Sequence, residues 1–569
     1  MKQTIEEKLV ASLRTAAERA GITDPEVHLE HPDEISHGDY ATNLALAYSK
    51  ILKTNPKILA EKILEEFKKD LPAEVESASI AGPGFINIKI KNSFFVENVL
   101  VIDDNYGKGN HDKGKKIMVE YTDPNPFKIF HIGHLMANAI GESLSRGIEF
   151  SGAKVIRANY FGDVGLHVAK TMWGILQNKN DFPKESESLV SRIEFLGRMY
   201  VLGANTEGEA VIKEIAEINK KIFEKSDTEI NTFYDLGRKW SLEYFETIYK
   251  KLGTKFDEYF PESSVAGDGI KIVQEFLKKG IFEVSEGATI FPGEKYGVHT
   301  RVFINSQGLP TYEAKELGLT KKKFELHPDL SESVVVTANE QSDYFKVLLK
   351  AIGAIYPDIA SKMKHLSHGI LRPTSGKMSS RKGNIVSAEE LLNEFQTLVL
   401  EKMKDREWKG NEKETVAEMV AIAALKYVVL RQAIGGDIIY DKEKIVSFEG
   451  DSGPYLQYAT VRAEAVVKKA HEAGISEKVS SKPEQVALLE RMLARFPETI
   501  TRARLEYAPH HIVTYLVELS SAFNSYYAVN KIIDEKDALS PYRVALTKAF
   551  VSVMKNGLWV LGIKVPERM

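Results

Sequence analysis

The sequence of 569 residues contains no cysteine. This absence excludes disulfide bonds, thiolate nucleophiles and zinc sites built on cysteine. The sequence also lacks an uninterrupted apolar run of about 18 residues, which is the length that a membrane-spanning helix requires. The N-terminal segment carries acidic side chains and has no apolar centre, so it is unlike a secretory signal. We therefore expect a cytoplasmic protein.

A strong excess of one charge is also missing. The chain has 76 Lys and Arg against 80 Asp and Glu, which gives a formal net charge of −4. A protein that coats nucleic acid would be clearly basic, so any contact with RNA has to come from local patches and shape. The length exceeds what one hydrophobic core can organise, and we expect about three or four domains.

The first chemical motif stands at residues 116–150. The apolar run KIMVEY is typical of a buried parallel strand, and the spacing of apolar residues in LMANAIGESLSRGIEF predicts a helix. Between them lies His-Ile-Gly-His, with His131, Gly133 and His134. A strand-to-helix turn of this kind forms the ligand crevice of a doubly wound sheet, where the helix N-terminus favours phosphate. The alternative is that one histidine caps the helix and the other belongs to the core.

A second motif, KMSSRKGN, occupies residues 377–384 and carries three cations in eight residues. A basic loop rich in serine and glycine can close over a triphosphate and neutralise the leaving pyrophosphate. Alone it could equally be a solvated surface loop. The two motifs follow each other in this order, more than 200 residues apart, and together they resemble the two signatures of class I aminoacyl-tRNA synthetases.

Further segments narrow the resemblance. They are EYTDPN (120–125), Gly162-Asp163, LPTYEAKELG (309–318), ANEQSDYF (338–345) and FEGDSGPYLQYATVR (448–462). On these residues the chain is similar, nearly from end to end, to the arginyl-tRNA synthetase family.

The resemblance implies a multidomain α/β protein. It comprises an α+β N-terminal domain over 1–110 that contacts the tRNA elbow and a Rossmann-like nucleotide-binding catalytic domain over 115–385, with an insertion at about 180–295. An all-α anticodon-binding bundle follows over 386–569. The implied reaction is ATP-dependent ligation of L-arginine to tRNA(Arg) through arginyl-adenylate, with release of AMP and pyrophosphate. ATP is then a substrate, Mg²⁺ accompanies its phosphates rather than binding a protein metal site, and the chain is expected to be a monomer.

The resemblance also implies roles for individual residues. Catalysis is assigned to His131, His134, Lys377 and Lys382. ATP binding is assigned to Lys128, Gly133, Lys377, Met378, Ser379 and Ser380. Arginine binding is assigned to Glu120, Asp123, Asn125, His131, Tyr312, Glu316 and Gln341.

Two of the arginine residues also have a physical rationale of their own. Tyr312 and Glu316 stand four residues apart, so they share one face of the expected helix. A carboxylate with an aromatic hydroxyl beside it suits a planar guanidinium. The family usually has Asp at the position of Glu316, and the extra methylene implies a slightly different contact geometry here.

Contact with tRNA is assigned to two regions. In the N-terminal domain, Phe85 and Asn87 lie on the open face of a predicted strand, where an aromatic and an amide could stack and bind bases. An ordinary half-exposed strand is the alternative. In the bundle, whose aromatics could equally be core, the assigned residues are Tyr455, Tyr458, Arg491, Arg495, Trp559 and Met569.

Three rival functions remain open at this point. A nucleotidylyltransferase can share the His-x-x-His crevice but lacks this much RNA-binding architecture. A catalytically silent tRNA-binding paralogue would have lost the two motifs, which are intact here. A synthetase for another class I amino acid is disfavoured by Tyr312, Glu316 and the N-terminal domain.

The second motif leads to a direct test. Lys377→Ala should lower kcat for pyrophosphate exchange while the KM for arginine changes little, because the lost cation acts on the transition state. Such a cation contributes about 2–4 kcal/mol, which corresponds to roughly 30- to 900-fold in rate. A wild-type exchange rate in this variant would refute the assignment.

Overall fold

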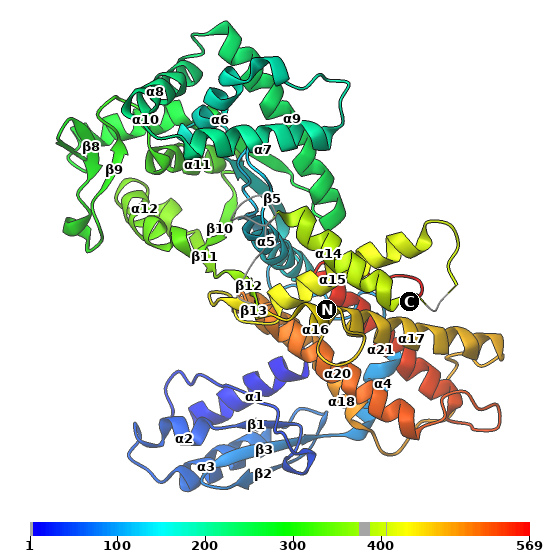
Figure 1. The fold of residues 1–569 in the computed structure, drawn as a ribbon. Coiled ribbons are helices and arrows are strands. Elements are labelled where there is room, and N and C mark those ends of the chain that lie inside the picture. The colour runs from blue at the N-terminus through cyan, green and yellow to red at the C-terminus, as the bar shows by residue number, and fades with distance from the viewer. Residues whose placement is uncertain (1–3, 375–386, 405–406) are drawn as a thin grey trace.

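The computed structural model describes residues 4–374, 387–404 and 407–569. Figure 1 shows a catalytic region above, a helical bundle in the middle and to the right, and an N-terminal domain below. The termini both lie in the region of the bundle. Among the described residues, no helix combines the length and the apolar character needed to cross a membrane.

The N-terminal domain has its own hydrophobic core. In strand β3, Ile86, Ile88 and Ile90 are fully buried, while Phe85 and Asn87 on the other face are half-buried. This alternation was predicted from the sequence, and it arises because successive side chains of a strand point to opposite faces. The sheet is antiparallel in the order β1-β3-β2. The elements are α1 (Ile5–Arg19), β1 (Tyr40–Thr42), α2 (Leu44–Ser49), α3 (Pro56–Lys69), β2 (Val75–Ala81) and β3 (Phe85–Ile90).

The catalytic region is built on a five-stranded parallel sheet in the order β11-β10-β4-β5-β6. From β4 the chain builds outward through β5 and β6, and it later adds β10 and β11 on the other side of β4. The carboxyl ends of β4 and β10 therefore form a topological switch point, where ligands bind in sheets of this kind. The strands are β4 (Lys116–Glu120), β5 (Lys154–Phe161), β6 (Glu258–Pro261), β10 (Leu330–Ala338) and β11 (Met363–His368).

Helix α5 (Ile132–Phe150) follows β4 and is buried along most of its length. The other helices of this region are α6 (Leu166–Gln177), α7 (Leu189–Asn205), α8 (Glu209–Glu224), α9 (Thr228–Leu252), α10 (Glu262–Lys278), α11 (Tyr312–Leu326), α12 (Ser342–Ile355) and α13 (Pro357–Ala360). A separate antiparallel sheet contains β7 (Glu283–Ser285), β8 (Ala288–Phe291) and β9 (Arg301–Ile304).

Part of the expected insertion at about 180–295 belongs to the five-stranded parallel sheet. Strand β6 falls within this range, yet it pairs in parallel with β5 through Ala158–Glu258 to Phe161–Pro261. The range therefore splits into the helices α7 to α9, then a sheet strand, and then α10 with the first two strands of the small sheet. A four-residue strand between long helices has too short a pattern to be recognised from sequence.

The C-terminal region is helical, as expected, apart from strand β13 (Ile438–Tyr440), which pairs with β12 (Leu371–Pro373). Its core is continuous with that of the catalytic region, so the two do not form separate hydrophobic units. Helix α4 (Asn92–Val101) also packs against this bundle, on α18 and α21. The helices are α14 (Ala388–Lys402), α15 (Glu412–Leu430), α16 (Lys442–Ile445), α17 (Gly453–Glu472), α18 (Leu488–Ala494), α19 (Phe496–Leu505), α20 (His510–Val529) and α21 (Ser540–Val560).

A buried ion pair joins the N-terminal domain to the bundle. The guanidinium of Arg491, on α18, contacts the carboxylate of Asp39, and both side chains are less than 9% exposed. Asp39 Oδ2 also accepts the backbone N–H of Ile90 at 2.7 Å, and Arg491 Nη2 donates to Asn92 Oδ1 at 3.1 Å. The guanidinium is therefore occupied within the protein. Its charge is used inside the protein, and the contact of Arg491 with tRNA stays a prediction.

The ion pair predicts a stability effect with a matched control. Arg491→Ala leaves Asp39 buried without its cation, and breaking a buried pair costs about 3–5 kcal/mol. Thermal unfolding should therefore begin at a clearly lower temperature. Arg502 is an exposed arginine nearby in the sequence, paired with Glu506 at 3.0 Å, and Arg502→Ala should leave the melting temperature unchanged. Equal melting temperatures for both variants would contradict the structural role of Arg491.

Candidate active site

Helix α5 begins at the switch point with a histidine as its N-cap. His131 Nδ1 accepts the backbone N–H of Gly133 at 3.1 Å, and the backbone N–H of His131 donates to His134 Nδ1 at 3.1 Å. The two rings stack with their centroids 3.7 Å apart. The capping interpretation and the site interpretation of these histidines are thus compatible, because capping uses only the Nδ1 atoms.

Both imidazoles are neutral near pH 7. Burial, together with the charge of Lys128, lowers the pKa of His131 to about 4. Burial also lowers the pKa of His134 well below its ordinary value. Since each Nδ1 accepts a hydrogen bond, the single ring proton of each histidine stands on Nε2. Each ring can therefore donate one Nε2–H hydrogen bond to an oxygen of a ligand at the helix start.

The loop between β4 and α5 holds a strained backbone. Thr122, Asp123 and Phe127 have φ values of 80°, 46° and 67°, which L-residues rarely adopt. Strain of this kind concentrates at functional sites and has to be held by surrounding contacts. One such contact is close packing of Tyr121 on Gly141 of α5, where a Cβ would lie 2.1 Å from the tyrosine ring.

A cavity of about 270 Å³ opens at the carboxyl ends of β4 and β10. Its lining contains every arginine-binding residue expected from the sequence, together with Gly133 and His134. These residues are Glu120, Asp123, Asn125, His131, Gly133, His134, Tyr312, Glu316 and Gln341. The structure thus brings together side chains from β4, the following loop, α5, α11 and the segment after β10.

Five acidic residues line this cavity, namely Glu120, Asp123, Glu262, Glu316 and Glu340, and two of them pair with buried lysines. Lys323 Nζ lies 2.6 Å from Glu120 Oε2, and both side chains are 1% exposed. Lys315 pairs with Glu262, and these two are also buried. Asp123 and Glu316 have no cation partner among the described residues, within the ion-pair distance of 4.0 Å. Within the described part of the chain, Asp123 and Glu316 are therefore carboxyl groups of the site without an ion-pair partner.

The pKa values of these two carboxyl groups reflect the lack of an ion-pair partner. Burial and then the neighbouring Glu120 raise the pKa of Glu316 to about 8. The same two causes raise the pKa of Asp123 well above its ordinary value. In the ligand-free protein at pH 7, Glu316 is therefore mostly protonated. A cation entering the cavity would favour the ionised form and release the proton.

The motif residues Asn125 and Asp163 orient neighbouring elements. Asn125 Oδ1 accepts the backbone N–H of Gly162 at 3.2 Å, and a Cβ at Gly162 would lie 2.4 Å from that oxygen. Asp163 is fully buried and accepts hydrogen bonds from the backbone and hydroxyl of Ser263, at 2.9 and 2.8 Å. It also pairs with Arg238 at 2.9 Å. Asp163 therefore anchors the start of α10 and the middle of α9 beside the site.

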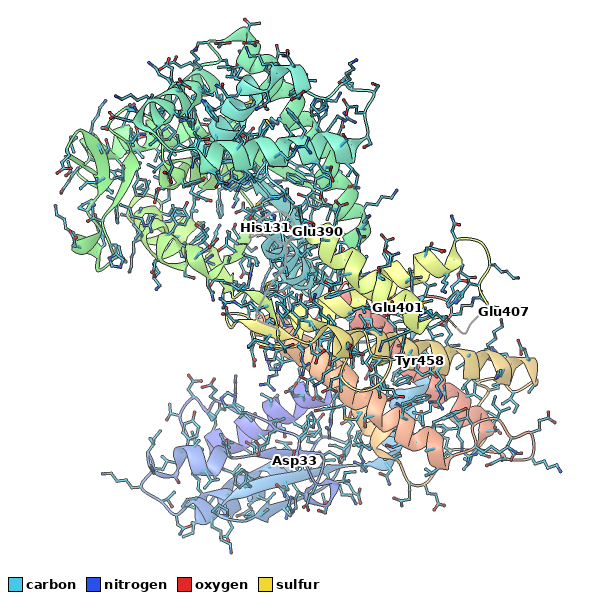
Figure 2. All side chains as sticks on the ribbon, viewed as in Figure 1. Asp33, His131, Glu390, Glu401, Glu407 and Tyr458 are labelled. Carbon is cyan, nitrogen blue, oxygen red and sulfur yellow. The ribbon has the colours of Figure 1, made fainter. Side chains whose placement is uncertain are left out.

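Lys128 lies near the histidines but does not line the cavity. Its ammonium group is 5.0 Å from the ring centroid of Tyr200, and its charge contributes to the lowered pKa of His131. The second motif falls outside the described residues, with Lys377, Met378, Ser379, Ser380 and Lys382. Ser387, which follows that segment, forms a β-bridge with His131, and Figure 2 shows Glu390 of α14 next to His131.

The residues expected to contact tRNA are spread over the bundle and the N-terminal domain. Tyr458 and Met569 line one cavity of about 210 Å³, and Figure 2 shows Tyr458 in the bundle, away from His131. Tyr455 is half-buried and accepts a hydrogen bond from Asn524 at 2.9 Å. Arg495 lines a larger cavity of about 980 Å³ between the N-terminal domain and the bundle.

Trp559 has a different environment from the other expected tRNA residues. It is 40% exposed and packs on the C-terminal end of α5, with the Arg146 guanidinium 5.2 Å from its ring centroid. Phe150 lies on its other side at a centroid distance of 6.0 Å. Trp559 therefore meets the catalytic region rather than the cavity of Tyr458 and Met569.

Several residues that line the cavity, or pair with its carboxylates, were not recognised from sequence. Glu262 was hidden within the expected insertion, and Lys315 and Lys323 are charged residues of a helix that resembles a solvated one. Tyr160 and Tyr344 belong to apolar segments that predict only a core position. These side chains meet because the sheet brings β5, α10, α11 and α12 to one place, which no local pattern encodes.

Comparison with known proteins agrees with this geometry. The profile described as tRNA synthetases class I (R), catalytic domain, matches residues 95–441, which is more than half of the chain. The fold and the site thus define a class I aminoacyl-tRNA synthetase. Profiles described as Arginyl tRNA synthetase N terminal domain and DALR anticodon binding domain match residues 3–90 and 456–569. The chain belongs to the arginyl-tRNA synthetase family.

Curated relatives and solved structures point the same way. The arginine–tRNA ligase of Clostridium kluyveri is 30% identical over 553 residues, covering 95% of this chain and 96% of that protein. The arginine–tRNA ligase of Treponema denticola is 30% identical over 570 residues and covers 96% of each. The fold matches Thermus thermophilus arginyl-tRNA synthetase with a TM-score of 0.83 at 23% identity, covering 100% of both chains.

The raised pKa of Glu316 predicts that arginine binding releases protons. At pH 7 the guanidinium should convert Glu316 to its charged form, so that about one proton enters the buffer from this group. Calorimetric titration in two buffers of different ionisation enthalpy measures the number directly. Release should shrink at pH 9, where Glu316 is already ionised.

The matched variant is Glu316→Gln, which should reduce the number of released protons by about one, because an amide has no proton to lose in this range. Glu209→Gln changes an exposed carboxylate on α8 and should leave the number unchanged. Equal binding heats of the wild-type protein in both buffers would show that Glu316 is ionised before arginine binds.

Proposed function

We propose that this chain ligates L-arginine to tRNA(Arg) in two steps in the cavity at the start of α5. In the first, a carboxylate oxygen of arginine attacks the α-phosphorus of ATP, the bond to the pyrophosphate breaks, and arginyl-adenylate forms. In the second, a terminal ribose hydroxyl of the tRNA attacks the arginyl carbonyl carbon and AMP leaves. Both steps depend on positioning and charge neutralisation and need no protein nucleophile.

The charge balance of the cavity is the observation that carries the arginine assignment. Two carboxyl groups of the cavity lining, the half-buried Asp123 and the buried Glu316, lack a cation among the described residues. Arginine supplies two cations, its guanidinium and its α-ammonium group. We assign the guanidinium to Glu316 and Tyr312 on α11, and the α-ammonium group to the side of Glu120, Asp123 and Gln341. A neutral side chain would form no ion pair with Glu316, which would then stay protonated because of its raised pKa.

The ATP end lies at the start of α5. The capping hydrogen bonds of His131 and His134 use their Nδ1 atoms and do not involve their Nε2–H groups. The dipole at the helix N-terminus also favours the binding of phosphate. Such donors act most strongly on oxygens that gain charge in the transition state. Lys377 and Lys382 are proposed, from the sequence, to neutralise the pyrophosphate, and Lys128 to contribute charge nearby.

Mg²⁺ is proposed only as a companion of the ATP phosphates. The described residues contain no group of three or more His, Asp or Glu side chains arranged to hold a metal ion. The two histidines present N–H donors toward the site, whereas a metal ion requires lone pairs. We therefore derive no step through a metal bound by the protein.

The contact with tRNA is proposed to extend along the chain. Phe85 and Asn87 of the N-terminal domain are assigned to the tRNA elbow, and the cavity of Tyr458 and Met569 to unstacked anticodon bases. A monomeric state and a cytoplasmic location complete the proposal.

An aminoacylation assay with each of the twenty amino acids and total tRNA tests this function. We expect charging with arginine alone, and charging with a different amino acid would end the proposal. Glu316→Gln should raise the KM for arginine more than the KM for ATP, because the carboxylate faces the guanidinium and not the nucleotide. An equal rise in both constants would count against the assigned orientation of arginine.

A further inference from the structure

Tyr160 is a buried polar residue that the mechanism above does not use. It lies on β5, and its ring belongs to a hydrophobic cluster with Met118, Phe260 and Leu319. Its backbone N–H donates to Asp123 Oδ1 at 2.9 Å, which ties this point of β5 to the strained loop after β4. The side chain is 8% exposed.

The hydroxyl group of Tyr160 lacks a partner. Among the described residues, no donor or acceptor forms a hydrogen bond with its Oη atom. Buried hydroxyl groups are nearly always hydrogen-bonded, because leaving one unpaired loses the hydration that it had in the unfolded chain. An orphaned hydroxyl in a native structure therefore calls for a partner that the protein itself does not supply.

The location of this hydroxyl suggests what the partner is. Tyr160 is among the residues that line the cavity of about 270 Å³. Groups from four elements act on it electrostatically: Glu262 of α10, Glu316 of α11, Tyr344 of α12 and Glu120 of β4. Burial and the negative charge of these carboxylates raise the pKa of Tyr160 well above its ordinary value, so the phenol remains protonated.

We propose that Tyr160 is a specificity-determining residue of the arginine site, whose hydroxyl oxygen accepts a hydrogen bond from the guanidinium of bound arginine. This inference rests on the proposed function and deepens it. A phenol oxygen carries two lone pairs, so it can accept a hydrogen bond from a ligand without losing its own hydrogen. The aromatic ring, held by the hydrophobic cluster, fixes the position of that oxygen.

The number of donors on a guanidinium explains why the Tyr160 oxygen is useful as an acceptor in addition to Glu316 and Tyr312. A guanidinium presents five N–H donors in a plane, more than one carboxylate can accept. Glu316 and the phenol oxygen together can satisfy donors on two sides of that plane. The ammonium group of ornithine is a compact point charge on a shorter chain and cannot reach both acceptors. Citrulline places a carbonyl oxygen where a donor is needed, so acceptor would face acceptor.

Tyr160→Phe tests the inference because it removes only the unpartnered oxygen. Arginine KM in pyrophosphate exchange, measured with the full chain, ATP and tRNA, should rise by roughly 10-fold or more, the value of a hydrogen bond to a charged group. The KM for ATP should stay the same. The melting temperature should be unchanged or higher, since the deleted hydroxyl makes no hydrogen bond in the folded protein.

Tyr249→Phe is the matched control. Tyr249 is also a buried tyrosine beside the sheet, with its Oη 3.4 Å from Asn159 Nδ2, but it does not line the cavity. Removing its hydroxyl should leave the KM for arginine at the wild-type value. Inhibition by ornithine provides a second measurement, and Tyr160→Phe should bring the affinities for arginine and ornithine closer together.

The possible outcomes separate the inference from the function on which it rests. Failure of the wild-type protein to charge arginine overturns the proposed function and the inference with it. Arginine charging by the wild type together with an unchanged arginine KM in Tyr160→Phe overturns the inference alone. A fall in melting temperature with parallel rises in both KM values would also overturn it, since that pattern marks a structural role.

Discussion

Buried guanidinium groups join the parts of this chain, and the arrangement of its active site relative to its RNA-binding surfaces depends on them. Arg491 pairs with Asp39 between the bundle and the N-terminal domain. Arg504 of α19 contacts Asp112 at 2.6 Å and Glu332 of β10 at 3.0 Å, between the bundle and the catalytic sheet. Such pairs add little net stability, but leaving either charge alone is costly. The planar, forked geometry of a guanidinium therefore selects one relative placement of the elements it joins.

Helix α5 connects the cavity to the junction between the catalytic region and the bundle through hydrogen bonds at both of its ends. At its start His131 and His134 cap the helix and line the cavity. Further along, Glu142 accepts hydrogen bonds from Tyr121 at 2.5 Å and from Arg146 at 2.7 Å. Arg146 in turn donates to backbone oxygens at the ends of α9 and α21, Gly253 and Trp559. A single helix, α5, thus fixes the distance between the cavity at its N-terminus and the C-terminal helix of the bundle.

Much of the site could be predicted because its motifs are local. The strand-to-helix turn at 116–150, the i,i+4 pair on α11 and the alternation of β3 each follow from periodicity within about a dozen residues. The cations around the site could not be predicted in the same way. Lys315 and Lys323 lie on a helix whose charged sequence resembles a solvent-exposed one, yet both are buried against carboxylates from other elements. The ion pair of Arg491 could not be predicted for the same reason: its partner Asp39 lies more than 400 residues away in the sequence.

The sequence by itself determined the family, the order of its domains, the two motifs of the class and nine of the 22 residues that line the cavity. These properties depend on residue types at short spacing, which a single chain displays directly. Only the tertiary structure decided which charges cancel one another and which stay available for a ligand. It placed β6 in the sheet, paired Arg491 with Asp39 and Glu120 with Lys323, and brought Glu316 and Tyr160 together in the lining of the cavity. The physical reason is that burial and partner distance set the state of an ionisable group, and both arise from contacts between segments far apart in the chain.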